Sequence, residues 1–238
     1  WGKGLTIGGE FYAMQVTDVN IGILYMFGVV SIGVYGIMIG GWASNNKYSL
    51  MGALRASSQM ISYEIAMGLA IIALVMMTGT LSVREIAEQQ AGAHWNVFYQ
   101  PLGFLIFIVC AFAECNRTPF DLPECESELV GGYHTEYSSM KFALFFLGEY
   151  AHMITASAFV AAIFLGGWSL LPGWDPLADV NTWWAALIKF HVFWGKILTI
   201  IVFYMLIRWT IPRFRFDQLM RICWLSLVPV GIAKSSPL

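Results

Sequence analysis

Acidic residues gather in one polar segment between two apolar stretches, at positions 114–136. Six of the chain's 15 acids fall within these 23 positions, beside a single Lys or Arg, Arg117. The six are Glu114, Asp121, Glu124, Glu126, Glu128 and Glu136. Carboxylates this close together cannot all be ionised, so proton uptake at one of them alters its neighbours. The spacing therefore predicts proton transfer.

A structural role accounts for part of this segment. Asp121 followed three residues later by Glu124 matches a capping box, with Pro123 in the first turn of a short helix. The glycine pair 131–132 would end that helix. Capping explains Asp121 and Glu124 but leaves three further acids without a structural role: Glu126, Glu128 and Glu136.

Charged residues also occur inside the apolar stretches. Glu64 and Glu149 do so, and Glu114 ends another such stretch. A charge within a bilayer costs roughly 3 kcal/mol or more, so these groups are expected to face a bundle interior or a wet cavity. We interpret Glu64, Glu149 and Lys196 as a proton relay in preference to purely structural buried pairs.

Histidine and lysine residues accompany these acids. His152 lies three residues after Glu149 and shares a helix face with it, yet we interpret it as a packed polar residue, like His191. Lys189 is expected to reach the membrane interface with its long side chain. Lys196, seven residues on, lies about 10 Å deeper along the same helix.

The elements that must position these residues are transmembrane helices. Hydrophobic residues make up 58% of the 238 residues and charged residues only 12%, whereas a soluble domain carries about 25% charged residues. We predict an all-α integral membrane protein, a single domain over residues 1–238 with no soluble domain and no internal repeat. A span needs roughly 17–25 apolar residues, and six candidates emerge: 20–43, 60–81, 97–113, 142–168, 185–209 and 219–232.

Orientation follows from Lys and Arg near the ends of the spans, since cytoplasmic loops carry the excess. One side has Lys47, Arg55, Arg117, Lys141, Arg208, Arg213, Arg215 and Arg221. The other side has Lys3, Arg84, Lys189 and Lys234. This places the loop 44–59, the acidic segment and the turn 212–217 in the cytoplasm. Trp168, Trp174, Trp183 and Trp184 would form an aromatic belt on the opposite side.

The four cysteines favour packing over metal chemistry. Cys110, Cys115, Cys125 and Cys223 contain no C-x-x-C pair, which excludes an iron–sulfur cluster held by this chain alone, and we expect no metal site. The chain opens at Trp1 without a methionine or a cleavage signature, so we expect it to begin inside a longer protein.

Three stretches carry a family resemblance. They read ECNRTPFDLPECESELVGGYHTEYSSMKFALFFLGEYAHMI at 114–154, GWASNNKYSLMGALRASSQMISYEIAMGL at 41–69 and IPRFRFDQLMRICW at 211–224. Taken in chain order, they closely resemble the H-type membrane subunit of respiratory complex I, the NADH:quinone oxidoreductase. Members usually have eight spans, so the resemblance implies that an amino-terminal pair is missing here. His152 stands where the family commonly has Asn.

The resemblance implies a function. Such a subunit anchors the hydrophilic arm, its cytoplasmic polar loops line much of the quinone chamber, and its carboxylates link quinone reduction to proton translocation. The carboxylates carried over by position are Glu114, Asp121, Glu124, Glu126, Glu128, Glu64 and Glu149. The chamber residues carried over are Arg117, Phe120, Tyr137, Lys47 and Arg55.

The same resemblance implies the surroundings. Quinone is the substrate, and this chain alone binds no cofactor. FMN and iron–sulfur clusters belong to partner subunits. The partners are quinone-module subunits of the hydrophilic arm, antiporter-like membrane subunits and the lipid bilayer, with no nucleic acid. The sequence variants DLPE and YHTEYS favour a bacterial plasma (cell inner) membrane, which the chain crosses several times with the acidic loop in the cytoplasm.

Two alternatives stay open. The first is the related membrane subunit of an energy-converting hydrogenase, which lacks quinone; the loop GWASNNKYSLMGALRASS and the segment NRTPFDLPE favour the quinone enzyme. The second is a stand-alone ion transporter that uses the buried acids as its binding site. A transporter would be isolated alone, whereas a complex I subunit would co-purify with many chains.

Overall fold

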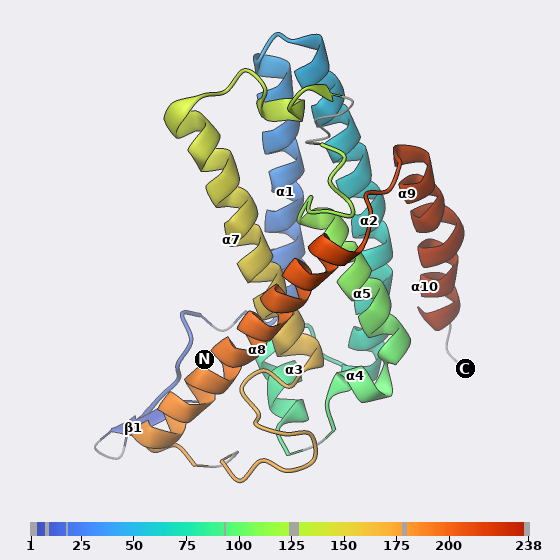
Figure 1. The fold of residues 1–238 in the computed structure, drawn as a ribbon. Coiled ribbons are helices and arrows are strands. Elements are labelled where there is room, and N and C mark those ends of the chain that lie inside the picture. The colour runs from blue at the N-terminus through green and yellow to red at the C-terminus, as the bar shows by residue number, and fades with distance from the viewer. Residues whose placement is uncertain are drawn as a thin grey trace.

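The computed structural model describes residues 4–7, 10–17, 19–92, 94–123, 129–177 and 180–235. Long apolar helices dominate it (Figure 1). A small hairpin of β1 (Leu5–Ile7) and β2 (Glu10–Tyr12) precedes them, with Leu5 paired to Tyr12. The backbone N–H of Thr6 donates to the carbonyl of Asn181, which fastens the hairpin beside the start of α8.

The first two helices form an antiparallel pair. α1 (Gly22–Ala43) is free of charge, and the Asn46 side chain accepts a hydrogen bond from the Tyr48 N–H to begin α2 (Lys47–Thr78). α2 ends at Gly79, whose left-handed φ of 74° suits a residue without Cβ. The sequence placed residues 44–59 in a cytoplasmic loop; that expectation is wrong for 47–59, which extend α2 by more than three turns.

A short helix is central to the site. After α3 (Val83–Gln90) and α4 (Asn96–Tyr99), α5 (Pro101–Glu114) runs for 14 residues. At 1.5 Å per residue it is about 21 Å long, less than the roughly 30 Å of a hydrocarbon core. Its last residue, Glu114, is therefore carried into the bundle rather than to a membrane surface.

The remaining helices complete the bundle. η1 (Gly132–His134) leads into α7 (Ser139–Phe164), which a long loop joins to α8 (Trp183–Thr210). The chain then forms one continuous helical segment from α9 (Phe216–Ile222) through the π-helical η2 (Cys223–Leu227) to α10 (Val228–Ser235). Pro229 follows the π turn, because it lacks the N–H that a regular α-helix would need there.

Within the described ranges, five helices are long and apolar enough to cross a membrane. They are Gly22–Ala43, Lys47–Thr78, Ser139–Phe164, Trp183–Thr210 and Phe216–Lys234. The all-α membrane fold predicted from the sequence is thus confirmed. The expected span 97–113 corresponds to α5, which is too short to be counted among these five. The weakest candidate, 219–232, lies in a 19-residue apolar helix.

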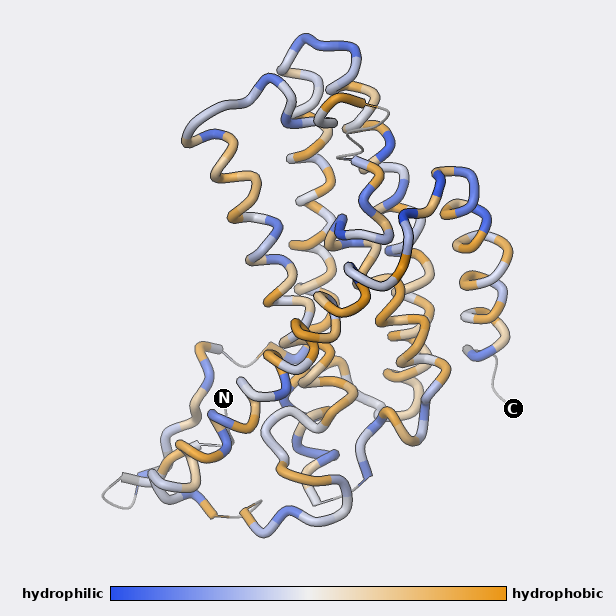
Figure 2. Tube along the Cα trace, viewed as in Figure 1, coloured by the Kyte–Doolittle hydropathy of each residue, from blue (hydrophilic) through white to orange (hydrophobic). Residues whose placement is uncertain are grey.

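Polar residues gather at the two ends of the bundle, and the helices between these ends are mostly apolar (Figure 2). The turn between α1 and α2 lies at one end with η1, and α3, α4 and the loop 165–177 lie at the other (Figure 1). Trp174, Trp183 and Trp184 are exposed near this second end, as expected for an aromatic belt. Trp168 differs, because it is buried in the protein.

α2 lies in the middle and packs against α1, α5 and α10. Small residues line its buried face, including Ala53, Ala56, Ala66 and Ala70, so neighbouring helices approach closely. Gly52 allows one such close approach: a Cβ there would lie 2.9 Å from the backbone nitrogen of Tyr133. The loop that contains η1 is therefore seated directly on α2.

Candidate functional site

The polar segment after α5 enters the bundle. The amide nitrogen of the buried Gln59 in α2 donates to the carbonyls of Ala113, at 2.7 Å, and Phe120, at 2.9 Å. The Phe120 ring packs edge-on against Tyr63 and also contacts Phe214. These contacts hold residues 115–121 against the middle of α2, so this part of the acidic segment is a buried loop rather than a surface one.

Glu64 points from α2 toward α1. Ser31, the one serine in that helix, donates a hydrogen bond of 2.9 Å to Glu64 Oε1. The Glu64 carboxylate also acts electrostatically on Glu114 of α5. This electrostatic effect therefore links Glu64 of α2 to the carboxylate of Glu114 in α5.

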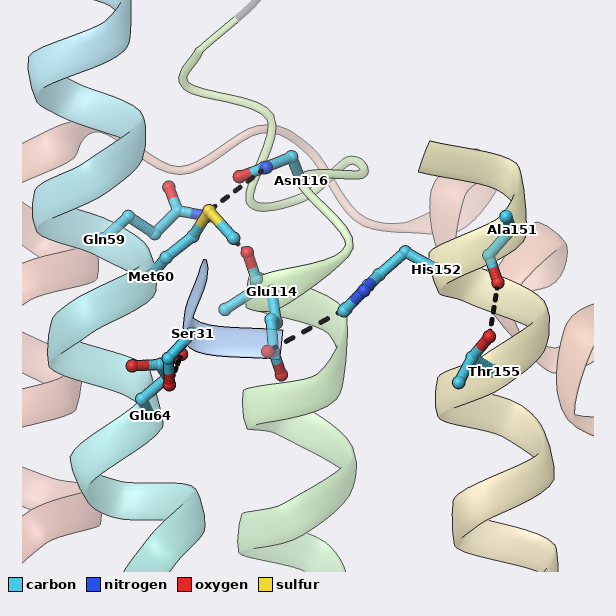
Figure 3. Close-up of polar contacts among 10 residues, drawn as sticks. Ser31, Gln59, Met60, Glu64, Glu114, Asn116, Ala151, His152 and Thr155 are labelled. Atoms are coloured by element: carbon cyan, nitrogen blue, oxygen red, sulfur yellow. Dashed lines mark hydrogen bonds and ion pairs between the residues drawn. The ribbon is translucent and has the colours of Figure 1, made fainter. Parts of the chain in front are cut away.

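Glu114 is the most deeply buried of these acids, with a side chain 5% exposed. Its Oε1 lies 3.9 Å from Nε2 of His152 in α7. Figure 3 shows Glu114 between the pair Ser31–Glu64 on one side and His152 on the other. Three helices thus contribute one titratable side chain each to the same polar centre.

Glu149 is held by residues of the loop. Arg117 lies 3.2 Å from Glu149 Oε2, and the Tyr133 hydroxyl donates to Oε1 at 2.8 Å. The Arg117 guanidinium also sits over the Tyr150 ring, 4.6 Å from its centroid. Since both partners of the ion pair are about nine-tenths buried, the pair fixes the loop to α7. We call Glu64, Glu114 and Glu149 the carboxylate cluster.

A cavity of about 260 Å³ joins two members of this cluster, Glu114 and Glu149. Glu114, Glu149 and His152 line it, together with Tyr133 and Asn116. Glycines 33, 36 and 148 form other parts of its wall, where the absence of side chains leaves space between α1 and α7. A cavity of this size with several polar groups can hold ordered water, which is the medium that proton transfer requires.

Asp121 is a further acid of the loop after α5, and its partner is an arginine that precedes α9. Arg213 lies 2.7 Å from its Oδ2. Burial raises the pKa of Asp121 to about 6; the Arg213 charge acts in the opposite direction, and the Glu149 charge adds to the rise. Asp121 therefore changes charge near neutral pH although it has an arginine partner.

This shift predicts a pH-dependent stability. Between 3.8, the ordinary pKa, and about 6 the folded protein holds a proton that the unfolded chain has lost. The stabilisation is complete below that window and is lost as the pH rises through it, by about 3 kcal/mol. Thermal unfolding in detergent should therefore show a wild-type midpoint that falls with rising pH relative to Asp121→Asn. An unchanged difference between the two proteins from pH 4 to 7 would contradict it, and the exposed Asp217→Asn is the control.

The expected chamber residues do not share one cavity in the described structure. Phe120 is buried in the core and Arg117 pairs with Glu149. Tyr137 donates to the carbonyl of Gly40 at 2.7 Å, while Lys47 is exposed at the start of α2 and Arg55 is partly buried on it. Their assignment to a quinone chamber stays a prediction.

Several expected acids are placed elsewhere or lie outside the described residues. Glu136 is exposed and accepts a hydrogen bond from the Asn46 amide at 2.5 Å, at the end of the bundle. Glu124, Glu126 and Glu128 lie outside the described residues, so the capping box of Asp121 with Glu124 and the roles of these acids stay predictions.

Lys196 is bound to the loop after α7. Its Nζ donates to the carbonyls of Leu165, Gly167 and Ser169 at 2.6–3.0 Å and lies 4.4 Å from the Trp95 ring centroid. Leu165 is 16 residues beyond Glu149, about 24 Å if measured along a helix. The structure therefore does not bring Lys196 to the carboxylate cluster, and its relay role stays a prediction. Lys189, expected to reach the interface, is instead buried and donates to the Val180 carbonyl.

Lys196→Met should destabilise the protein by about 3 kcal/mol, because three carbonyls at the end of α7 lose a charged donor. A lower midpoint of thermal unfolding in detergent is the measurement. Thr199→Val is the control, since that exposed hydroxyl bonds only within its own helix, to Gly195. Equal midpoints for Lys196→Met and the control would show that these hydrogen bonds contribute little.

Sequence reasoning missed four partners of the acids. Ser31, Tyr133 and Arg213 bond Glu64, Glu149 and Asp121, and His152 faces Glu114 instead of merely packing. Ser31 could have been found from the sequence, because it is one of few hydroxyl-bearing residues in a span without charge. Nothing in the sequence indicated the partnerships of Tyr133 and Arg213, because both depend on contacts between distant segments.

The helices bring together a set of buried carboxylates with an imidazole and a cavity. Among the described residues, no three His, Cys, Asp or Glu side chains are grouped as ligands for a metal ion. The fold and the site thus define a multi-pass helical membrane protein with a buried group of titratable side chains.

Comparisons with known proteins give the family. The sequence pattern described as NADH dehydrogenase matches residues 5–235. The chain belongs to the NADH dehydrogenase family, among its H-type membrane subunits, as the sequence motifs predicted.

Curated relatives agree with this assignment. An H-type subunit of the NADH-quinone oxidoreductase of Cytophaga hutchinsonii is 61% identical over 233 residues, covering 98% of this chain and 67% of the relative. The H-type subunit of the same enzyme from Flavobacterium johnsoniae is 60% identical over 235 residues, covering 98% and 66%. An H-type subunit from Geobacter metallireducens is 51% identical, covering 92% and 59%. The chain spans about two thirds of the length of the curated relatives it matches.

Proposed function

We propose that the chain is the coupling subunit of a proton-translocating NADH:quinone oxidoreductase, in which it anchors the hydrophilic arm and lines the quinone chamber. The carrying observation is the buried carboxylate cluster, found in a chain 61% identical to an H-type subunit of an NADH-quinone oxidoreductase. Intramembrane carboxylates are costly, and they are retained where protons must move.

The carboxylate cluster is the proton path in this proposal. Quinone reduction near the loop creates negative charge and a demand for protons. Asp121 responds first, because its pKa of about 6 lies close to working pH and Glu149 acts on it electrostatically. A change of charge there shifts the proton between Glu149, Glu114 and Glu64 in turn, since neighbouring carboxylates titrate as a coupled set.

The loop 115–137 is the element that transmits the change. It is fixed to α7 by Arg117 and Glu149, to α2 by Gln59, and to the connection between α8 and α9 by Asp121 and Arg213. Two of these three attachments are ion pairs whose strength depends on a carboxylate charge. Protonation of either carboxylate would release that attachment and allow the loop to move.

The chamber and its partners extend the proposal. Arg117, Phe120 and Tyr137 shape the quinone site from the loop, with Lys47 and Arg55 on α2. The relay further includes Glu124, Glu126 and Glu128 of the same segment, and Lys196. Partner subunits that hold FMN and iron–sulfur clusters supply the electrons, quinone-module subunits of the hydrophilic arm bind this chain, and antiporter-like subunits carry the protons. The assembly lies in a bacterial plasma membrane with the acidic loop on the cytoplasmic side.

Affinity purification tests the proposal directly. A tagged chain, extracted from its native membrane in mild detergent, should bring down many subunits and reduce a soluble quinone with NADH. Isolation of the chain alone would contradict the proposal and favour a stand-alone transporter. An assembly that evolves hydrogen and ignores a quinone-site inhibitor would favour an energy-converting hydrogenase.

A further inference from the structure

His152 lies between two members of the carboxylate cluster. Its Nε2 is 3.9 Å from Glu114 Oε1, and Glu149 precedes it by three residues on the same face of α7. Neither Nε2 of His152 nor Oε1 of Glu114 has a hydrogen-bond partner among the described residues, and both atoms are buried. Two polar atoms facing each other across this gap are too far apart for a direct bond and suitably spaced for a bridging water.

Two cavities meet at this side chain. The larger, of about 260 Å³, is lined by Glu149, Glu114 and His152. A smaller one of about 40 Å³ is lined by Glu114 and His152 among apolar residues. The imidazole thus lines both cavities and borders the space that joins Glu149 to Glu114.

The charged groups around the imidazole favour a proton-carrying role. Glu114 faces it from α5, with Glu64 of α2 behind that carboxylate, while Glu149 lies on its own helix. Arg117 and Tyr133 approach from the loop and η1 but bind Glu149. Within the part of the chain that the structure describes, the charged group at ion-pairing distance from the imidazole is therefore a carboxylate, that of Glu114.

Imidazole differs from other side chains of similar size in what it can do there. It accepts a proton at one nitrogen while holding another proton at the second, and it changes charge between about pH 5 and 8. An asparagine amide fills much of the same space but cannot change its protonation state. The distinction allows packing and proton transfer to be separated experimentally.

Resting on the proposed function, we propose that His152 carries protons between Glu114 and Glu149. In the first step the O–H bond of protonated Glu114 breaks and an N–H bond forms on neutral His152, directly or through one water, which leaves a carboxylate and an imidazolium. In the second step the imidazolium gives a proton to ionised Glu149. The sum moves one proton from Glu114 to Glu149, returns His152 to its neutral form and needs no further reactant. The reverse direction uses the same bonds.

The test uses the assembled oxidoreductase in membrane vesicles, with His152→Asn as the variant. Quinone reduction and proton translocation are measured separately between about pH 5 and 8, the range in which histidine changes charge. The expected result is a fall of about a hundredfold in translocation, the lower end of what a lost proton-transfer group produces. The pH dependence of translocation should flatten, while quinone reduction in uncoupled vesicles should fall less than translocation does. His191→Asn is the matched control, because His191 lies in another span, is exposed and bonds only the Leu187 carbonyl.

A second variant protects the test against a folding defect. His152→Ala enlarges the cavity, and added imidazole should restore translocation in it but not in His152→Asn. A normal rate with an unchanged pH profile in His152→Asn would overturn the inference. A rate that falls equally at every pH, without rescue of the alanine variant, would overturn it too, because that is the signature of packing.

Failure of this inference is distinguishable from failure of the proposed function. If Glu149→Gln abolishes translocation while His152→Asn behaves as wild type, only the role of His152 is lost. If Glu149→Gln also translocates protons normally, Glu149 leaves the relay, and the proton path proposed through the carboxylate cluster is wrong with it.

Discussion

Glu149→Gln should lower proton translocation by at least about tenfold, because the amide cannot take up or release a proton. Quinone reduction in uncoupled vesicles should fall less, since Glu149 lies on the proton path. The measurement is translocation and quinone reduction in vesicles that contain the assembled oxidoreductase. The amide keeps the shape of the carboxylate and can still accept the hydrogen bond from Tyr133.

A surface acid provides the comparison for this variant. Glu88→Gln removes the same charge from a partly exposed carboxylate that pairs with Arg84 one helical turn away. It should leave both rates unchanged. Wild-type translocation in Glu149→Gln would remove this residue from the relay.

Arg117→Met should destabilise the protein by about 3 kcal/mol or more, because it leaves the buried carboxylate of Glu149 without its cation. Methionine keeps an unbranched apolar side chain but removes the guanidinium that lies over the Phe146 and Tyr150 rings. Chemical denaturation in detergent measures the effect. Adding Glu149→Gln should restore much of the lost stability, since the double variant buries no unpaired charge.

The exposed pair Arg84–Glu88 is the matched control for this cycle. Its side chains are 28% and 32% exposed, against 12% and 10% for Arg117 and Glu149. Arg84→Met should therefore cost at most about 1 kcal/mol. Similar losses for Arg84→Met and Arg117→Met, or a double variant no better than Arg117→Met, would mean that Glu149 does not depend on Arg117.

The helices were largely predictable because lipid imposes length and apolarity on each span. The depth of α5 was not foreseen, although Pro101 carried the signal: proline favours the first turn of a helix and moves the start from 97 to 101. The extension of α2 through residues 47–59 was missed for another reason. Its polar residues look like a loop, yet many of them are buried against other parts of the protein, as Ser49 and Gln59 show.

The identities of the buried acids were predictable, but their partners were not. Glu64 and Glu149 stand out because a carboxylate in an apolar stretch is costly. Arg117 and Glu149 are 32 residues apart in sequence, and Asp121 and Arg213 are 92 apart, so only the packed bundle brings them together. For Lys196 the partners differ in kind from those expected. A lysine deep in a span suggested a relay, whereas in the structure its Nζ donates to three carbonyls at the end of α7.

The central claim is that the carboxylate cluster changes protonation when quinone is reduced. An infrared difference spectrum between the oxidised and reduced assembly measures this directly, through the C=O stretch of protonated carboxylic acids. The account predicts such signals in the wild type, with distinct parts of them lost in Glu114→Gln and in Glu149→Gln but retained in Glu88→Gln. Identical carboxylic-acid signals in all four proteins would contradict it.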